Sequence, residues 1–481
     1  MKTGITITTR LAAAALMAAL AACTSMPEQR TVALPSPPPQ TESNNPTQRE
    51  HARIVAAYGG TYEDSKLEAM VNETIDRLVK ASERPDLKYR VVILNSSAIN
   101  AFALPNGQLY VTRGLLALAN DRSELASVLS HEMSHVIANH AQIRENQARQ
   151  VAMISTIAND VLKDPEVGAL ALAKSKLALA SFSRAQEFEA DGIGVGIAAR
   201  AGFDAYGAVR FLNDMQRYGE LKTGANADPR ATDFLATHPA TPERVQNAQA
   251  NARQFGSPGT GARDRAEYLE RVNGMVYGED PSEGFVRGRR FLHSKLGFTF
   301  VAPPGFTLDN TAQAVLGIKE GGNEALRFDV VQVPAKQSLT DYLNSGWMEN
   351  VDPKSVEQFT VNGFPAAGAT AKGNDWSFRL YAVRFGSDVY RFIFAAKHPS
   401  AVTNKAFRES LNSFRRMTLQ EAQNTKPLRV KVVTVGLRDT IETLSRRMAT
   451  GDKKRETFLV LNGLNAGSSL APGSQVKIVV E

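Results

Sequence analysis

The 481-residue sequence contains a single cysteine, Cys23, so it has no second thiol with which to form an internal disulfide bond. Beyond its first residues it lacks any uninterrupted apolar run long enough to span a bilayer, and it lacks a repeat that would indicate a solenoid. Lys and Arg (56) outnumber Asp and Glu (49), but they are scattered, which argues against nucleic-acid binding. The whole sequence is 43% hydrophobic, enough for several cores, and its length indicates two to four domains.

The N-terminal residues are typical of an exported, lipid-modified protein. Lys2 and Arg10 precede a short apolar run, so residues 1–22 are predicted to be a signal peptide. The sequence Leu-Ala-Ala-Cys that ends at Cys23 resembles the lipobox of bacterial lipoproteins, and the lone cysteine favours lipidation over an ordinary cleaved signal. No Asp follows Cys23, which by the same resemblance implies the periplasmic face of the outer membrane, with the protein anchored to the membrane through lipid.

Composition divides the rest of the chain into four parts. Residues 23–46 hold the lipidated cysteine and a Pro-rich linker, which cannot bury enough apolar surface to fold. Residues 47–280 have a mainly helical pattern with two extended stretches, and residues 284–420 alternate like the strands of an α+β domain. Residues 428–481 form a last unit with the predicted order strand, helix, helix, strand.

A helix with metal-binding spacing lies in the first folded domain. Asp121 and Glu124 form a candidate capping box, and apolar residues then recur at helical spacing, so an amphipathic helix is expected across residues 131–135. His131 and His135 are four residues apart, which places both on one face of such a helix, about 40° apart and one turn up.

Two imidazoles in that arrangement can share one zinc ion. Glu132 lies beside the same face, where its carboxylate can act as general base on a water that the ion activates. The alternative is a chance match in which the histidines are only buried and hydrogen-bonded.

The site needs a third ligand. His140 is rejected, because a continuous helix would point it about 180° away from His131. Glu187 and Asp191 are four residues apart on a later helical segment, with Glu189 turned away from both. We assign Glu187 to the metal and Asp191 to orienting a ligating histidine, against the alternative of a solvated acidic helix face.

The His-Glu-x-x-His sequence, followed by Ser-Arg-x-x-Glu-x-Glu-Ala-Asp-x-x-Gly from Ser183 to Gly194, resembles the M48 family of zinc metallopeptidases. The resemblance covers about residues 47–251 and implies a zincin-like, mainly α (α+β) peptidase domain. It implies one zinc ion per chain, held by the two histidines and the first glutamate of the second motif. It also implies that Asn100, Ala101, Phe102 and Ala103 belong to an edge strand on which an extended peptide substrate could add.

His238 has three interpretations. Family members carry a histidine on this loop that can reach the zinc, so it could stabilise the oxyanion, or it could fill the open position as a latent switch, which we favour. The third interpretation is a His-Pro turn residue at a helix start. The segment from Val151 to Ala180 is expected to be a lid, a groove wall or part of the core.

The two trailing domains also resemble known modules. Residues 284–420 loosely resemble the α+β domains of the photosystem P-subunit (PsbP) and Mog1 type, with no candidate site. Residues 428–481 resemble a LysM module, a βααβ family that binds N-acetylglucosamine polymers, although Arg438 stands where that family usually has Gly. Peptidoglycan is therefore a candidate partner of this unit, and a purely structural role is the alternative.

Together these patterns predict a multidomain, lipid-anchored zinc endopeptidase that cleaves unfolded or misassembled envelope proteins. One alternative is a catalytically latent chaperone or binding protein, and another is a LysM-targeted cell-wall hydrolase. No nucleic-acid partner is expected.

Overall fold

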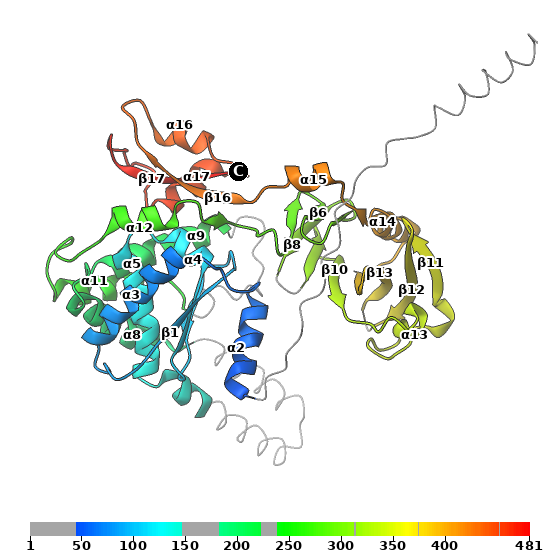
Figure 1. The fold of residues 1–481 in the computed structure, drawn as a ribbon, viewed down its shortest axis with the longest axis horizontal. Helices are drawn as coiled ribbons and strands as arrows, with labels where there is room; N and C mark the ends of the chain where they lie inside the picture. Colours follow the sequence, from blue (N-terminus) through cyan, green and yellow to red (C-terminus); the bar gives the residue numbers. More distant parts are fainter. Residues whose placement is uncertain (1–44, 147–181, 223–237, 312–313, 374, 452) are drawn as a thin grey trace, which may run out of the picture. The chain divides into compact units, whose positions relative to one another are not determined.

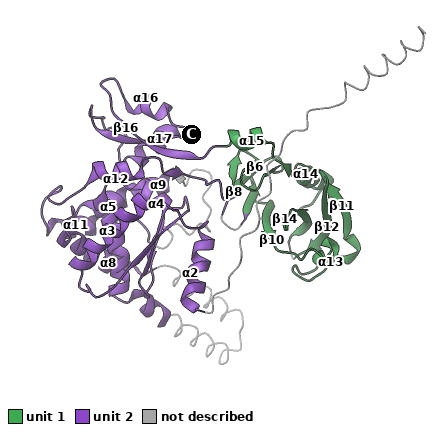
Figure 2. Ribbon diagram, in the orientation of Figure 1, with its two compact units in different colours: residues 1–38, 284–309, 315–425 green, residues 39–283, 310–314, 426–481 purple. Residues whose placement is uncertain are grey.

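The computed structural model describes residues 45–146, 182–222, 238–311, 314–373, 375–451 and 453–481. The signal peptide, Cys23, almost all of the linker and the segment from Val151 to Ala180 lie outside the described residues. Within the described ranges, no helix combines the length and apolarity needed to cross a bilayer. The chain is multidomain and forms two compact units. In the order of the described residues, the first unit is purple and labelled unit 2 in Figure 2, and the second is green and labelled unit 1 there.

The first unit contains a small sheet next to a group of helices (Figure 1). The sheet has the order β1-β3-β2, in which β1 and β3 are parallel and β2 is antiparallel to β3. Its strands are β1 (Arg90–Leu94), β2 (Ala101–Ala103) and β3 (Gln108–Thr112). The helices are α2 (Pro46–Ala57), α3 (Ser65–Ala81), α4 (Arg113–Leu118), α5 (Arg122–Ile137), α8 (Arg184–Arg200), α9 (Gly207–Lys222), α11 (Pro242–Arg253) and α12 (Arg265–Val272).

Helix α5 is the central element of this unit, and it contacts α3, α8, α9 and β2. It begins at the N-cap Asp121, whose side chain accepts a hydrogen bond from the Glu124 backbone N–H. Every residue from Arg122 to His135 is buried. The expectation of an amphipathic helix is therefore wrong, because neighbouring elements cover all sides of α5 and leave it no solvent-facing polar side from Arg122 to His135.

A C-terminal module is built from residues 428–481 with the order strand, helix, helix, strand. Its elements are β16 (Leu428–Thr434), α16 (Ile441–Arg446), α17 (Lys454–Leu461) and β17 (Gln475–Val480). The sequence predicts this segment as a separate domain, whereas the structure groups it with the first unit. Its sheet has the order β17-β16-β4, and the third strand, β4 (Val276–Tyr277), follows α12.

The second unit spans residues 284–309 and 315–425 and is rich in β-strands. A seven-stranded sheet has the order β11-β12-β13-β14-β10-β9-β8, and a four-stranded sheet has the order β15-β7-β6-β5. The strands are β5 (Phe285–Arg287), β6 (Arg290–His293), β7 (Phe298–Val301), β8 (Phe306–Asn310), β9 (Val315–Lys319), β10 (Glu324–Val331), β11 (Glu357–Val361), β12 (Phe364–Lys372), β13 (Ser377–Phe385), β14 (Asp388–Ala396) and β15 (Arg415–Arg416). The remaining elements are α13 (Leu339–Leu343), η1 (Pro353–Ser355), α14 (Ala401–Asn412) and α15 (Leu419–Asn424). Its core is an aromatic cluster that includes Phe298, Phe300 and Phe392.

Gly194 allows α8 to pack closely against α5. A Cβ atom at Gly194 would lie 3.0 Å from the backbone nitrogen of His131 and 3.1 Å from its Cα. At Gly192, in the same helix, the nearest atom to an added Cβ would be 3.5 Å away, in ordinary van der Waals contact. The distance between the two helices therefore depends on the missing side chain at Gly194.

We expect Gly194→Ala to be less stable than Gly192→Ala by about 1–3 kcal/mol, the usual cost of forcing an extra carbon into a packed interface. Both changes gain the same helix propensity, about 1 kcal/mol, so this term cancels in the comparison. Thermal unfolding of the two variants under identical conditions measures the difference. Equal melting temperatures would show that α5 and α8 are not packed as closely as described.

Candidate metal centre

Four buried side chains converge between α5, α8 and the start of α11. They are His131, His135, Glu187 and His238, and one potential ligand atom from each lies within 4.8 Å of all the others. The Nε2 atoms of His131 and His135 are 3.1 Å apart. Each of these atoms is 3.6 Å from an oxygen of Glu187. The structure thus brings together the three residues that the sequence suggested as ligands, and it adds His238.

These separations fit a tetrahedral zinc site. Zinc binds histidine nitrogen and carboxylate oxygen at about 2.0–2.2 Å, so two ligand atoms of a tetrahedron lie about 3.3–3.5 Å apart. The separations between the two histidine nitrogens and the Glu187 oxygens, 3.1–3.6 Å, are close to this value. The donor set of two imidazoles and one carboxylate is also one that zinc uses in hydrolytic sites.

His238 occupies the remaining side of this group. Its Nδ1 lies 3.4 Å from Nε2 of His131 and 2.8 Å from Oε1 of Glu187. The ring is only 2% exposed, so it is not a surface turn residue. A fourth ligand and a water molecule compete for the same corner of a tetrahedral site, and His238 is close enough to take that corner.

Glu132 lies beside the four ligand candidates and points one oxygen toward them. Its Oε1 atom is 3.8 Å from Nε2 of His238. Among the described residues nothing forms a hydrogen bond with this oxygen, although it is buried. Burial raises the pKa of the Glu132 carboxyl. A buried hydrogen-bond acceptor without a partner is costly. The position of Oε1 therefore suits an acceptor that gains its partner, such as a water molecule, only while the site is at work.

Asp191 and Arg244 support His131 and Glu187. Oδ1 of Asp191 lies 3.0 Å from Nδ1 of His131, which leaves Nε2 of that ring directed into the centre. Arg244 donates two hydrogen bonds to Asp191, at 2.7 and 2.8 Å, and its Nη1 lies 2.7 Å from Glu187. One buried guanidinium therefore holds both carboxylates of α8 in place.

His140 and Glu189 support His135 in the same way. Nδ1 of His140 is 2.9 Å from Nδ1 of His135, and its Nε2 is 3.2 Å from a Glu189 oxygen. If Nε2 donates to the carboxylate, Nδ1 of neutral His140 accepts a hydrogen bond from His135, which directs Nε2 of His135 toward the ion. The continuous helix expected here is wrong, because α5 ends at Ile137 and Asn139 adopts a left-handed φ of 54°, which turns His140 back.

The charges at the centre favour a bound cation. Burial lowers the pKa of His131, but hydrogen bonds and charges from Asp191 and Glu187 outweigh burial and raise it to about 9. Burial opposes ionisation of Glu187, yet its histidine partners bring its pKa well below the usual range. Burial, followed by the charge of His131, lowers the pKa of His135. The carboxylates are thus ionised and hold a positive charge where an ion would bind.

The predicted edge strand lies next to α5, the helix that carries His131 and Glu132. Strand β2, which contains Ala101, Phe102 and Ala103, is at the end of its sheet and contacts α5. Asn100 precedes it and donates a hydrogen bond from Nδ2 to the hydroxyl of Tyr58, at 2.8 Å. The Tyr58 ring lies 5.8 Å from that of Phe102. In the described part of the sheet, the outer side of β2 has no partner strand.

Sequence reasoning gave no role to Arg244 or His140, and it treated Glu189 as pointing elsewhere. Arg244 lies within residues 47–251, which resemble metallopeptidases, but its carboxylate partners are about 50 residues earlier in the chain. His140 could have been found only if the helix end had been placed before it.

Comparison with known proteins agrees with this geometry. Residues 65–252 match the model of a family described as "Peptidase family M48". The beta-barrel assembly-enhancing protease of Escherichia coli is 30% identical over 201 residues, which are 40% of this chain and 40% of that protein. The corresponding protease of Yersinia pestis is 30% identical over 230 residues, 45% of each chain. The human mitochondrial metalloendopeptidase OMA1 is 28% identical over 169 residues, 33% of this chain and 32% of that protein.

Residues 65–252 of this chain are thus similar to the M48 family of peptidases. The matched segment contains all three ligand candidates and Glu132, and His238 falls within it as well. The chain spans about two fifths of the length of the bacterial relatives, so the similarity concerns the peptidase domain and leaves out the remainder of those proteins.

Similarity to solved structures is weak. A cyanobacterial PsbP protein from Synechocystis covers 29% of this chain and 98% of its own, with 15% identity and a TM-score of 0.23. A crystal structure from Bacteroides thetaiotaomicron covers 40% of this chain and 87% of its own, with 11% identity and a TM-score of 0.25. Scores this low carry no argument about fold.

We expect His140→Ala to weaken zinc binding by about 10–100-fold, because residues that orient a metal ligand contribute that much to metal affinity. The measurement is a zinc dissociation constant obtained by competition with a chromophoric chelator. His398→Ala makes the same chemical change at an exposed site in the second unit and should leave the constant unaltered. Equal constants for the two variants would remove His140 from the metal centre.

Proposed function

We propose that this chain is a lipid-anchored zinc endopeptidase of the bacterial envelope that cleaves unfolded or misassembled proteins, with Glu132 as general base. One observation carries the proposal. Three buried ligand candidates have the spacing of a zinc site, and the unsatisfied oxygen of Glu132 lies next to them. His238 approaches the fourth corner, but a site that served only to hold zinc would not need a buried carboxylate oxygen beside it that forms no hydrogen bond with the described residues.

Zinc bound here would lower the pKa of a coordinated water and polarise the scissile carbonyl. The protein's own side chains transfer the protons and hold the ligands in place. Glu132 accepts the proton of the attacking water and passes it to the leaving amine, for which its burial and raised pKa are favourable. His131, His135 and Glu187 are ligands, and Asp191 fixes the orientation of the His131 ring.

Substrate would bind as an extended strand along β2. The exposed main-chain groups of an edge strand bind a peptide through backbone hydrogen bonds, which read side chains only weakly. Contact between β2 and α5 supports this position for the peptide, because α5 carries Glu132. A segment must be unfolded before it can add as a strand, so the expected substrates are unfolded or misassembled proteins.

Two observations support the proposed location in the cell envelope. The sequence around Cys23 has the lipobox pattern. Two of the bacterial relatives are named beta-barrel assembly-enhancing proteases. We propose the periplasmic face of the outer membrane, with peptidoglycan as a partner of the C-terminal module.

His238 supports a latent resting state. Its Nδ1 lies among the ligand atoms, and its Nε2 is 3.8 Å from the general base. A histidine in the fourth ligand position excludes the water that hydrolysis needs. In this proposal the His238 side chain leaves the fourth position when substrate binds, and the site then opens to water.

We expect Glu132→Gln to abolish chelator-sensitive cleavage of casein, with a loss of at least about 10²-fold, while the zinc content remains near one per chain. Glutamine keeps the shape of the side chain but cannot accept the proton. The matched control is Glu68→Gln, on the exposed face of α3. If Glu132→Gln cleaved casein like the unaltered protein, the chain would be a binding protein or chaperone instead.

We expect His238→Ala to cleave casein several-fold faster than the unaltered protein, because removing the ring opens the fourth corner of the site to water. Initial rates at saturating zinc measure this, with His398→Ala as the control for loss of a histidine elsewhere. Complete loss of cleavage would show that His238 assists the reaction by stabilising the oxyanion.

A further inference from the structure

The C-terminal module and the peptidase domain share one sheet and one core. Strand β16 pairs with β4, and the backbone N–H of Gly274 donates to the carbonyl of Val430 at 2.7 Å. Val430 and Val460 are members of the hydrophobic core cluster that also contains residues of α5. The module is thus joined to the peptidase domain through main-chain hydrogen bonds and buried apolar side chains.

Lys477, on β17, makes the most buried polar contact of this junction. Its side chain is 0% exposed. The ammonium donates three hydrogen bonds to consecutive backbone carbonyls, those of Ala117 at 2.7 Å, Leu118 at 3.1 Å and Ala119 at 2.7 Å. Asn462 fixes the backbone of Lys477 on both sides, because it accepts from its N–H at 2.7 Å and donates to its carbonyl at 2.8 Å.

The three carbonyls lie immediately before the catalytic helix. They end α4, and a single residue, Asn120, separates Ala119 from Asp121, the N-cap of α5. Arg265 spans the same junction, since its Nη1 donates to the Asn120 carbonyl at 2.8 Å and its Nη2 to the Gln475 carbonyl at 3.2 Å. Strand β17 is therefore linked to the residues before α5 in two ways. The Lys477 side chain binds the three carbonyls directly, and Arg265 bridges the carbonyls of Gln475 and Asn120.

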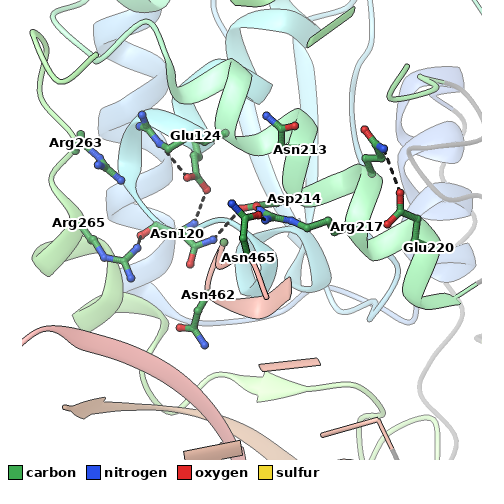
Figure 3. Close-up of a pocket in the computed structure, with 13 residues that line it drawn as sticks. Asn120, Glu124, Asn213, Asp214, Arg217, Glu220, Arg263, Arg265, Asn462 and Asn465 are labelled. Carbon is green, nitrogen blue, oxygen red and sulfur yellow. Dashed lines mark hydrogen bonds and ion pairs between the residues drawn. The ribbon is translucent and has the colours of Figure 1, made fainter. Parts of the chain in front are cut away.

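Side chains around Asn120 extend this junction (Figure 3). Nδ2 of Asn120 donates to Asp214 at 3.0 Å, and Arg217 contacts both Asp214 and the carbonyl of Leu464. Asn120, Asp214 and Arg217 line a polar pocket of about 480 Å³ between α5, α9 and the loop after α17. Residues of the module and of the peptidase domain thus share one hydrogen-bond network.

Burial of an ammonium group is costly, and it persists only where the group is fully hydrogen-bonded. Burial lowers the pKa of Lys477 to about 7, with Arg265 acting in the same direction and the carboxylates of Glu124 and Asp214 opposing. A methionine or leucine would fill the same space without this cost. The lysine is thus explained by the three carbonyls that it satisfies.

We propose that Lys477 is a positioning residue for the peptidase, through which the C-terminal module sets the direction of α5 and so the place of His131 and Glu132. The inference rests on the proposed function. His131 lies about 13 Å along the helix from its first residue, so a tilt of about 5° at the start displaces the ring by about 1 Å. Displacement of catalytic groups by this much can cost about 10²-fold in rate.

The test compares Lys477→Met with Lys431→Met in the full chain. Lys431 is an exposed residue of β16, so its variant makes the same chemical change without loss of the buried hydrogen bonds. Three quantities are measured at a temperature where circular dichroism shows both variants folded. They are the zinc dissociation constant, the visible absorption spectrum of the Co²⁺-substituted protein, and kcat and KM for a casein-derived peptide.

For Lys477→Met we expect zinc binding at least about ten-fold weaker, an altered Co²⁺ spectrum and kcat at least about ten-fold lower, with KM within about two-fold. A loss of folded protein alone would reduce the intensity of the Co²⁺ bands without changing their position. Lys431→Met should match the unaltered protein throughout.

If Lys477→Met does not fold, Arg265→Gln serves as the test variant, because it removes the second, half-buried link to Asn120. It should change the same three quantities in the same direction. Unchanged zinc affinity, Co²⁺ spectrum and kcat in the folded variant would overturn the inference. Failure of the unaltered protein to bind zinc or to cleave peptide would instead overturn the proposed function on which the inference rests.

Discussion

The arrangement of the metal centre depends on one buried cation, the guanidinium of Arg244. Two carboxylates four residues apart on α8 would repel each other in a site with little water, and Arg244 neutralises that repulsion by binding both. Asp191 can then face the His131 ring while Glu187 faces the ligand atoms. The His135 ring is held by a separate route through His140 and Glu189. Each ligating histidine candidate thus has its own oriented partner, which limits the rings to the orientation that a metal ion requires.

Local spacing in the sequence predicts those features of the site that involve residues close together in the chain, and it does not predict contacts between residues far apart. The spacing of His131 and His135 follows from the pitch of a helix, and so does the pairing of Glu187 with Asp191, because both are local. The structure brings these two pairs together, although their roles stay predictions. His140 was misjudged because a helix end is difficult to locate from pattern alone, and a left-handed residue such as Asn139 reverses the direction of the next side chain. Arg244 and Gly194 act on residues of other helices, and a single sequence contains no signal for such contacts.

The fold follows the same rule. Elements that depend on local sequence patterns are predicted, and contacts between distant segments are not. The strands predicted for residues 284–420 are present, and the order strand, helix, helix, strand of residues 428–481 is recovered. The amphipathic pattern assigned to α5 failed because burial on all sides removes the polar face on which periodicity depends. The predicted domain boundaries at residues 280 and 428 rest on changes in composition along the sequence. Composition could not reveal that β4 and β16 pair, since main-chain hydrogen bonds leave little trace in side-chain identity.

The pairing of β4 with β16 also sets an order of events for a chain that emerges from its N-terminus. The whole second unit lies in the sequence between these two strands, so β4 has no partner until residue 428 and beyond have been delivered. Contacts between residues this far apart form late, because closure of such a loop costs entropy before any contact repays it. The core cluster that contains residues of α5 therefore becomes complete only after residues 428–480 have joined it, because Val430 and Val460 are among its members.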